Sequence, residues 1–453
     1  RCDRVRVTDM THGRPIRLIL LFSLPLMLGS VFQQLYTIVD TIIIGRGVGM
    51  QALASIGAAD WINWLVLWGL QGFTQGFAIL AAQEFGAGAY DRLRRVLAMI
   101  VKLSCWFGIA VTIISLLLVR PLLTLLHTDP AVFGGAQTYL YVQFGGPLII
   151  IAYNMAAAVL RCLGDSRTPL FAIIAASFAN IALDLLFVMG FGWGIFGASF
   201  ATVLAQLTAF LLCLHSLRRL PFVQLTKADW KTDPAILLHL CRLGIPTGLQ
   251  MSMITLGGMV LQSVLNGFGV VFVAGYTAAN KLYGILESAS VAFGYAMTAY
   301  MGQNRGARNA ARIDAGIRAV LALSAGFTAA IVTAMLLAGK PLLGLFLSTE
   351  EAGAADALAV AHRYLMVLMA FLLALFVLQA YRSSMQGLGE MTVPTLSGFA
   401  EMLMRMGAAL VLPVFIGKSG VFFAEGAAWV CAAALNLVWY YIRVGKIKRE
   451  MMQ

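Results

Sequence analysis

The sequence predicts an all-α integral membrane protein, with twelve transmembrane helices in two six-helix pseudo-symmetric lobes built as parallel repeats. Three observations support this fold class. The 453 residues are 60% hydrophobic and only 11% charged, the chain contains twelve long apolar stretches, and its two halves repeat the same short motifs. Soluble domains have about 25% charged residues, so charges this sparse cannot cover a surface that faces water.

The twelve apolar stretches approach or exceed the roughly 20 residues that a helix needs to cross the hydrocarbon core. We expect transmembrane helices near 18–45, 52–82, 96–118, 136–160, 169–190, 195–217, 237–266, 270–300, 315–339, 358–381, 393–416 and 421–442. Several exceed twenty residues, so tilt, kinks or extension into water are expected. The six cysteines show no paired spacing, which excludes a disulfide scaffold.

Lys and Arg residues concentrate in alternate connections between these spans. The two ends of the chain and every second loop together hold 23 of them, whereas the intervening loops hold 4. Because basic loops stay in the cytoplasm, we expect a multi-pass protein of the cytoplasmic (inner) membrane with both termini cytoplasmic. The net charge of +12 therefore reflects topology, and no nucleic-acid partner is expected.

Motifs of the first half recur about 220 residues later. The segments 22–25, 83–87, 120–123 and 163–165 recur at 243–246, 303–307, 340–343 and 388–390. Six spans per half is an even number, so the two halves cross the membrane in the same sense. We predict an N-lobe (1–217, helices 1–6), a cytoplasmic inter-lobe loop (218–236) and a C-lobe (237–453, helices 7–12).

Two six-helix halves are an architecture that secondary transporters use. The chain has no G-x-x-x-x-G-K-[ST] phosphate-binding loop and no soluble stretch that could form a nucleotide domain. No filter sequence indicates an ion channel, and no Ser-His or His-Glu arrangement recurs at helical spacing to indicate a membrane enzyme. We therefore expect a secondary active transporter without a cofactor, not an enzyme, and a monomer in the lipid bilayer.

Two aspartates in the first half, Asp40 in span one and Asp184 in span five, demand a functional explanation. An ionisable group inside a bilayer costs several kcal/mol and marks a candidate functional site. Neither has a Lys or Arg at similar depth in its half, and the repeat offsets place Leu261 and Ala409 at the corresponding positions of the second half.

Oxygen-bearing side chains accompany both aspartates. Tyr36 and Asn180 stand four residues before Asp40 and Asp184, on the same helix faces, and Thr202 reaches a comparable depth. Such a set could share a proton or coordinate Na⁺. The alternative is that the aspartates are protonated and only hold helices together.

The second half has its own intramembrane charges. Glu401 and Arg405 are four residues apart and are expected to neutralise each other in a structural role. Glu287, in span eight, is the candidate that could instead contribute to a functional site. Asp60 and Glu425 lie near outer span ends, where water can reach them, and are weaker signals.

Other polar, aromatic and sulfur-containing side chains could line a substrate cavity. Trp68 and Gln71 lie deep on one face of span two and could stack on a flat aromatic cation, and methionines suit an adaptable pocket. The proposed cavity residues are Gln33, Gln34, Trp68, Gln71, Met251, Met259 and Glu287. An interfacial aromatic belt and ordinary membrane packing are the alternatives. Pro25 and Pro246 interrupt matched spans and predict kinks that could act as conformational hinges.

Taken together, these residues resemble the multidrug and toxic compound extrusion (MATE) family. Leu24-Pro25, Gln33-Gln34-Leu35-Tyr36 and Val39-Asp40-Thr41 resemble its first helix, and the segments 83–88, 160–169, 302–307 and 386–390 fit the same family. The resemblance implies a twelve-helix exporter in two lobes, driven by an inward H⁺ or Na⁺ gradient. It also implies amphipathic organic cations and other drugs as substrates.

Within that family the chain resembles the DinF-like bacterial branch. Another branch has essential acids in helices seven and ten, but spans seven and ten here contain no Asp or Glu. The resemblance implies that protonation or ion binding bends helix one at its proline and expels the drug outward. The residues it assigns to this coupling site are Asp40, Asp184, Asn180, Thr202, Tyr36, Asn154 and Pro25, with Na⁺, if used, at the first four.

A flippase for lipid-linked oligosaccharides, of the same superfamily architecture, is the alternative function. Such proteins usually have extra helices and a basic central cavity. The buried charges of the first half are acidic here, which favours a cationic substrate.

Overall fold

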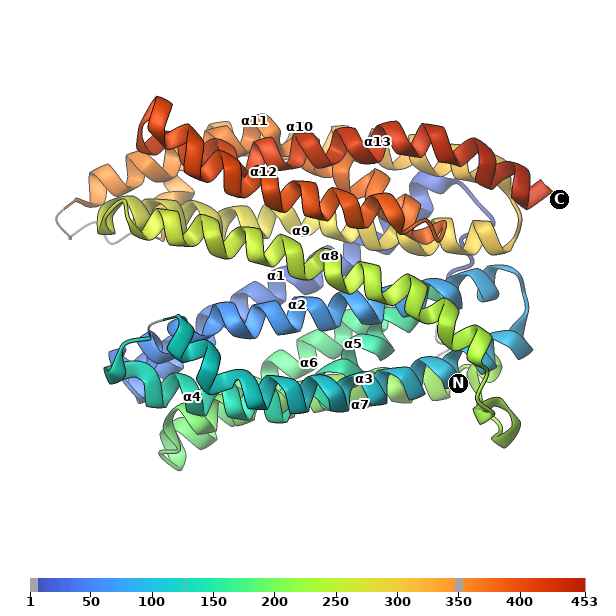
Figure 1. Ribbon diagram of the computed structural model, residues 1–453, viewed down its shortest axis with the longest axis horizontal. Coiled ribbons are helices and arrows are strands. Elements are labelled where there is room, and N and C mark those ends of the chain that lie inside the picture. Colours follow the sequence, from blue (N-terminus) through green and yellow to red (C-terminus); the bar gives the residue numbers. More distant parts are fainter. Residues whose placement is uncertain (1–6, 127, 347–352, 453) are drawn as a thin grey trace. The chain divides into compact units, whose positions relative to one another are not determined.

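The computed structural model describes residues 7–126, 128–346 and 353–452, and within them the chain is helical throughout (Figure 1). The α-helices are α1 (Pro15–Gly47), α2 (Met50–Gly86), α3 (Tyr90–Leu125), α4 (Pro130–Gly145), α5 (Pro147–Cys162), α6 (Arg167–Asp184), α7 (Gly194–Arg218), α8 (Pro234–Asn266), α9 (Val270–Gly306), α10 (Ala310–Gly344), α11 (Ala354–Gly387), α12 (Thr392–Ile416) and α13 (Phe423–Met452). A π-helix, η1 (Leu185–Gly190), continues α6, and three 3₁₀ segments, η2 (Pro221–Val223), η3 (Lys227–Trp230) and η4 (Lys418–Phe422), lie in connections.

The helices coincide with the predicted spans. Within the described residues, ten helices are long and apolar enough to cross a membrane, and α4 with α5, which meet at a 52° bend, pass the same test as a pair. The remaining predicted span, 270–300, corresponds to α9, which has 37 residues. The expected all-helical membrane fold is therefore confirmed, with span four built from two helices.

The contacts divide the chain into two compact units. The first contains Leu24–Gly248 together with the described residues before Met10, and the second contains Met10–Ser23 and Leu249–Gln453. One boundary lies before α1, and the other two fall inside helices, close to Pro25 in α1 and Pro246 in α8; both helices continue through their prolines. The predicted limits of the lobes, at 217 and 237, stay a prediction.

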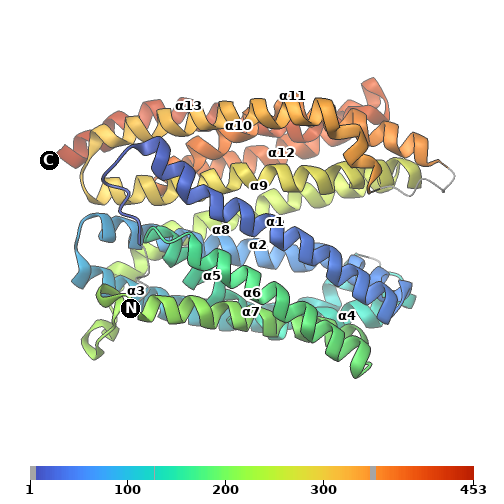
Figure 2. The same ribbon diagram turned by 180° about the vertical axis from the view of Figure 1, so that it is seen from behind.

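In the first unit, α2 and α7 each pack against several neighbours. α2 contacts α3, α4 and α5, while α7 contacts α4, α5 and α6, and Figure 2 shows α6 and α7 running side by side. Small residues allow the closest approaches: a Cβ added at Gly76 of α2 would lie 2.5 Å from the Cα of Gly244 in α8.

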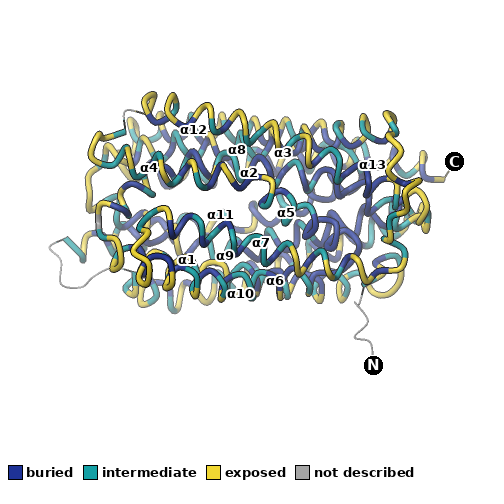
Figure 3. The backbone as a smooth tube through the Cα atoms, turned by 90° about the horizontal axis from the view of Figure 1, so that it is seen from below, coloured by how far each residue is buried: buried dark blue, intermediate teal, exposed yellow. Residues whose placement is uncertain are grey.

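In the second unit, α11 is the central helix. It packs against α9, α10 and α13, and α12 in turn packs on α13. In Figure 3, buried residues follow the inward sides of the helices, and exposed residues mark their outer turns and ends. The apolar outer faces are those that a lipid environment would cover.

The helices α1 and α8 each contribute residues to both units, and a polar segment precedes each of them. The start of α1 is held within the second unit, because Met10 N donates to Gln303 Oε1 (2.8 Å) and Arg312 donates to the carbonyls of Met10 (3.0 Å) and Gly13 (2.9 Å). Asn304 Nδ2 donates to the same Met10 carbonyl (3.1 Å). The repeated motif at 303–307 therefore anchors the residues before α1.

The segment before α8 is anchored within the first unit. Asp229 accepts hydrogen bonds from the backbone and side chain of Thr226 (both 2.7 Å) and lies 3.6 Å from Arg94. Burial would raise the pKa of Asp229, but these hydrogen bonds and the charges of Arg94 and Arg95 outweigh it and lower that pKa below its ordinary value. The carboxylate therefore stays ionised and holds the segment at neutral pH.

Candidate functional site

Asp40 and Asp184 come from α1 and α6 of the first unit. Asp184 is the last residue of α6 and is 0% exposed, and Asn180, one turn earlier, is 1% exposed. Asp40 is partly buried in the second half of α1. The π-helix η1 begins directly after Asp184, and π segments interrupt α-helices frequently at functional sites.

The structure brings these two carboxyl groups together. Each is the other's close polar neighbour. Neither oxygen of Asp184, nor Oδ1 of Asp40, has a hydrogen-bond donor among the described residues, so a hydrogen bond between the two requires a proton on one of them. No ion pair joins either carboxyl to a Lys or Arg in the described part of the chain.

Four of the predicted residues, but neither aspartate, line one small cavity in the first unit. Its volume is about 30 Å³, enough for about one water molecule or small ion. The lining residues are Gln33, Tyr36, Tyr153, Ile173, Ala176, Ser177, Asn180, Thr202, Ala205, Gln206 and Ala209. The tyrosine hydroxyl of Tyr36 interacts with Gln33 and lies within electrostatic reach of both aspartates. α1, α5, α6 and α7 thus converge on one polar space.

The side chains of Thr202 and Asn154 also form hydrogen bonds within their own helices. Thr202 Oγ1 donates to the carbonyl of Ala198 (3.1 Å), and Asn154 Nδ2 donates to the carbonyl of Ile150 (3.0 Å). Thr202 still lines the cavity, whereas Asn154 does not; its neighbour Tyr153 does. Both amide atoms of the Asn180 side chain are buried and have no partner among the described residues, which leaves them available to a water molecule or an ion.

Sequence reasoning missed Gln206, Asn63 and Tyr139 of this site and marked Asp60 only as a weaker signal. Gln206 lies one turn after Thr202 on the same face of α7, and its buried Oε1 has no partner among the described residues. Asp60 lies within electrostatic reach of Asp40, and the hydroxyl of Tyr139 lies 3.5 Å from its Oδ1 while accepting a hydrogen bond from Asn63 (3.2 Å). The i, i+4 spacing from Thr202 could have identified Gln206.

The remaining cavity candidates do not line this space. Gln34 and Trp68 are exposed, Gln71 is partly buried, and Met251, Met259 and Glu287 are partly buried in the second unit. Their role in binding a substrate stays a prediction.

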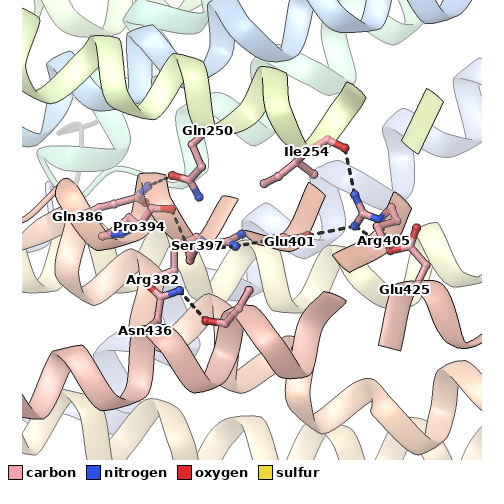
Figure 4. Close-up of polar contacts among 11 residues, drawn as sticks. Gln250, Ile254, Arg382, Gln386, Pro394, Ser397, Glu401, Arg405, Glu425 and Asn436 are labelled. Carbon is pink, nitrogen blue, oxygen red and sulfur yellow. Dashed lines mark hydrogen bonds and ion pairs between the residues drawn. The ribbon is translucent and has the colours of Figure 1, made fainter. Parts of the chain in front are cut away.

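The charges of the second unit form a larger network than the predicted Glu401/Arg405 pair (Figure 4). Arg405 donates to Glu401 (3.0 Å), to Glu425 (2.8 and 3.0 Å) and to the carbonyl of Ile254 (3.0 Å). Arg382 donates to the other carboxyl oxygen of Glu401. Glu425, which the sequence marked as a weak signal, is therefore an internal member, and Glu287 contacts Tyr283 beside it.

No group of three or more His, Cys, Asp and Glu side chains that could hold a metal ion occurs among the described residues. The acid pair, with amide and hydroxyl oxygens around it, is an arrangement for a proton or for a hard, weakly bound cation, not for a tightly held transition metal.

Comparison with known proteins identifies the family. The MatE family model matches residues 25–186 and 246–411, well over half of the chain. The chain belongs to the MatE family. This confirms the resemblance to MATE proteins drawn from the sequence, and it makes the molecule a membrane transporter and not an enzyme.

Curated relatives cover nearly the whole of this MatE transporter. It is 32% identical over 452 residues to the probable multidrug resistance protein YpnP of Bacillus subtilis (strain 168), with 98% of both chains covered. It is 27% identical over 441 residues to the probable multidrug resistance protein YoeA of the same organism, with 95% of this chain and 94% of the relative covered.

A solved structure shares the fold. The crystal structure of a MATE protein in complex with MaL6 superposes with a TM-score of 0.90 at 24% identity, covering 99% of this chain and 100% of that one.

Proposed function

We propose that this MatE transporter is a secondary antiporter that exports amphipathic, mostly cationic, drugs and toxic organic compounds in exchange for H⁺ or Na⁺, by alternating access. The observation that carries the proposal is the buried Asp40/Asp184 pair, which has no Lys or Arg partner in the described part of the chain. Two such carboxyls need a cation from solution to neutralise them, and an antiporter exploits that need. The names of the curated relatives support drugs over a lipid-linked oligosaccharide as cargo.

The acid pair is the coupling site in this proposal. A proton or Na⁺ that enters from outside binds between Asp40 and Asp184, with Asn180, Thr202 and Tyr36 supplying further oxygens. Because binding removes the repulsion between the carboxylates, α1 can pack closer to α6. As in the DinF-like branch that the sequence resembles, the reshaped α1 then collapses the drug-binding pocket of the N-lobe and expels the drug outward. The space of about 30 Å³ lined by Tyr36 and Asn180 is large enough only for the coupling ion or a water molecule.

Pro25 and Pro246 are the hinges of the proposed cycle. The unit boundaries fall next to both prolines, and a proline removes one helical hydrogen bond, which makes bending easier at that point. The residues of α1 after Ser23, including Asp40, can therefore move while the residues before it stay anchored.

Replacing either aspartate tests the proposal. In proteoliposomes, with a ΔpH and a Na⁺ gradient imposed separately, we expect Asp40→Asn and Asp184→Asn to reduce gradient-driven export of a fluorescent organic cation to the level of protein-free vesicles. The gradient that drives the unaltered chain identifies the coupling ion. Asp91→Asn, at a side chain that is 88% exposed, is the matched control and should export normally.

Two results would reject this function. Full export by Asp40→Asn, with normal yield and monodispersity, would show that the pair does not couple transport. Export of a lipid-linked oligosaccharide in preference to the organic cation would assign the chain to the flippases instead.

A further inference from the structure

The C-terminal end of α13 carries a groove that plays no part in the proposed export mechanism. Its volume is about 830 Å³, and it is lined by Trp439, Ile442, Arg443, Lys446, Arg449 and Glu450. These residues repeat at intervals of three and four, so they form one face of the helix. Figure 1 shows this end of α13 beside the label of the C-terminus.

Along α13 the exposed surface changes abruptly from apolar to cationic. Leu435, Val438 and Ile442 are 43%, 56% and 59% exposed, a surface suited to hydrocarbon. From residue 443 onwards, directly after the predicted span 421–442, the groove is cationic. A surface that is apolar over two turns and then basic matches the two parts of a phospholipid.

The cations of the groove outnumber the carboxylates that neutralise them. Glu390 lies 3.7 Å from Arg443, and both Glu390 and Glu450 interact electrostatically with Arg305. The groove lining itself holds three cations, Arg443, Lys446 and Arg449, and one carboxylate, Glu450; counting the neighbouring Arg305 and Glu390 as well gives four cations and two carboxylates. The excess of two positive charges makes this end of α13 attractive to anions.

Lys446 and Arg449 are the cations that the protein leaves most available. Lys446 lies 4.0 Å from Glu450, with both side chains more than half exposed, a pair that contributes little. Arg449 donates only to the carbonyl of Gly445 in its own helix (3.3 Å) among the described contacts. Lys448, by contrast, is paired with Asp314.

Trp439 supplies both an aromatic face and a free donor. The guanidinium of Arg443 lies over its ring, 5.7 Å from the centroid. Its Nε1–H is shielded from solvent and has no acceptor among the described residues. Tryptophans favour the level of lipid headgroups, where one side is apolar and the other polar.

We propose that this groove binds an anionic phospholipid, with an acyl chain along Leu435, Val438 and Ile442 and the phosphate on Lys446 and Arg449. The groove shares no residue with the proposed coupling site at Asp40 and Asp184, so each of the two proposals can be rejected without rejecting the other.

Binding of defined lipids to the full-length purified protein tests this site. The chain in mixed micelles is titrated with phosphatidylglycerol, with phosphatidylcholine and with inorganic phosphate, and bound molecules are counted by native mass spectrometry. We expect one phosphatidylglycerol to be retained and phosphatidylcholine to bind at least about tenfold more weakly. Since each Lys or Arg near an anionic lipid is worth about 1 kcal/mol, the double variant K446Q/R449Q should lose about thirtyfold in affinity.

Arg318→Gln is the matched control. Arg318 is also exposed on its helix and also donates only to a carbonyl four residues earlier, Asp314 O at 3.3 Å, but it lies outside the groove. The Arg318→Gln variant should bind phosphatidylglycerol as tightly as the unaltered chain does. Arg449→Gln alone should lose about fivefold in affinity. Equal losses in the two variants, equal binding of both lipids, or displacement of the lipid by millimolar inorganic phosphate would each overturn the proposal.

Discussion

The two units differ in whether their intramembrane acids have basic partners. Asp40 and Asp184 have no basic partner among the described residues, and the other charged group within reach of Asp40 is the carboxyl of Asp60, so neutralising the pair depends on a bound cation. Glu401 is compensated twice, by Arg382 and Arg405. A carboxyl with two guanidinium partners gains nothing from a proton, which is why the second network fits a structural role.

Removing Glu401 should therefore destabilise the protein strongly. Glu401→Gln leaves Arg382 and Arg405, which are 4% and 5% exposed, without that carboxylate, and breaking a buried pair from one side costs about 3–5 kcal/mol. We expect a clearly lower melting temperature in detergent, measured by intrinsic fluorescence.

A double variant separates lost charge from lost packing. Arg382→Met together with Glu401→Gln removes one buried charge of each sign and leaves Arg405 paired with Glu425, so it should recover part of the lost stability. A double variant as unstable as the sum of its two single variants would contradict this explanation.

The sequence predicted those site residues whose side chains are unusual for an apolar membrane span. An aspartate within an apolar span is conspicuous by itself, so Asp40 and Asp184 were identified. Asn63, Tyr139 and Gln206 are ordinary residues in sequence, and they join the polar region only through packing of helices distant in the chain.

At the level of elements, hydropathy predicted every span but not how each is built. Among the described residues, eleven of the twelve apolar stretches correspond to a helix or a bent helix pair long and apolar enough to cross a membrane, and the twelfth corresponds to the long helix α9. Length and apolarity are local properties, which is why the sequence predicts them. The 52° bend in span four falls at Gly145, Gly146 and Pro147, a sequence that signals a break. The π-helix after Asp184 has no such signal, since α-helical and π-helical hydrogen bonding use the same residue types.

The crossing of α2 and α8 in the first unit depends on two glycines. A Cβ at Gly76 would lie 2.5 Å from the Cα of Gly244 and 2.6 Å from the carbonyl oxygen of Leu243, and backbone atoms cannot move aside cheaply. Gly76→Ala should therefore lower stability by about 1–3 kcal/mol, the usual cost of overpacking.

A second glycine of α2 provides the control. A Cβ at Gly57 meets nothing within 4 Å, so Gly57→Ala should be neutral or slightly stabilising, given the better helix propensity of alanine. Both variants can be compared by thermal unfolding in the same detergent. Equal stability of the two would show that this helix crossing tolerates a side chain.

At the scale of the whole molecule, α9 determines which side of the membrane each terminus occupies. The ten apolar helices and the bent pair amount to eleven spans among the described residues, which would place the termini on opposite sides. α9, which carries Lys281 and Glu287, makes twelve and places them on the same side. The alternation of 23 and 4 basic residues between connections favours twelve.

Reporter fusions test that topology. A green fluorescent protein joined to the C-terminus should fluoresce, and alkaline phosphatase joined there should be inactive, because positive loops keep this end in the cytoplasm. Alkaline phosphatase joined after Gly344, at the end of α10, should be active. The reverse pattern at either position would refute the twelve-span arrangement.

The anchored start of α1 also sets the scale of motion that coupling needs. Arg312, Gln303 and Asn304 hold the residues around Met10. The start of α1 is therefore fixed, while the part of the helix beyond Pro25 can tilt. Asp40 lies fifteen residues beyond Pro25, roughly 22 Å along the axis at 1.5 Å per residue. A deflection of about 10° at the proline displaces that carboxyl by roughly 4 Å, so a modest tilt is enough to part the two acids or to press them together.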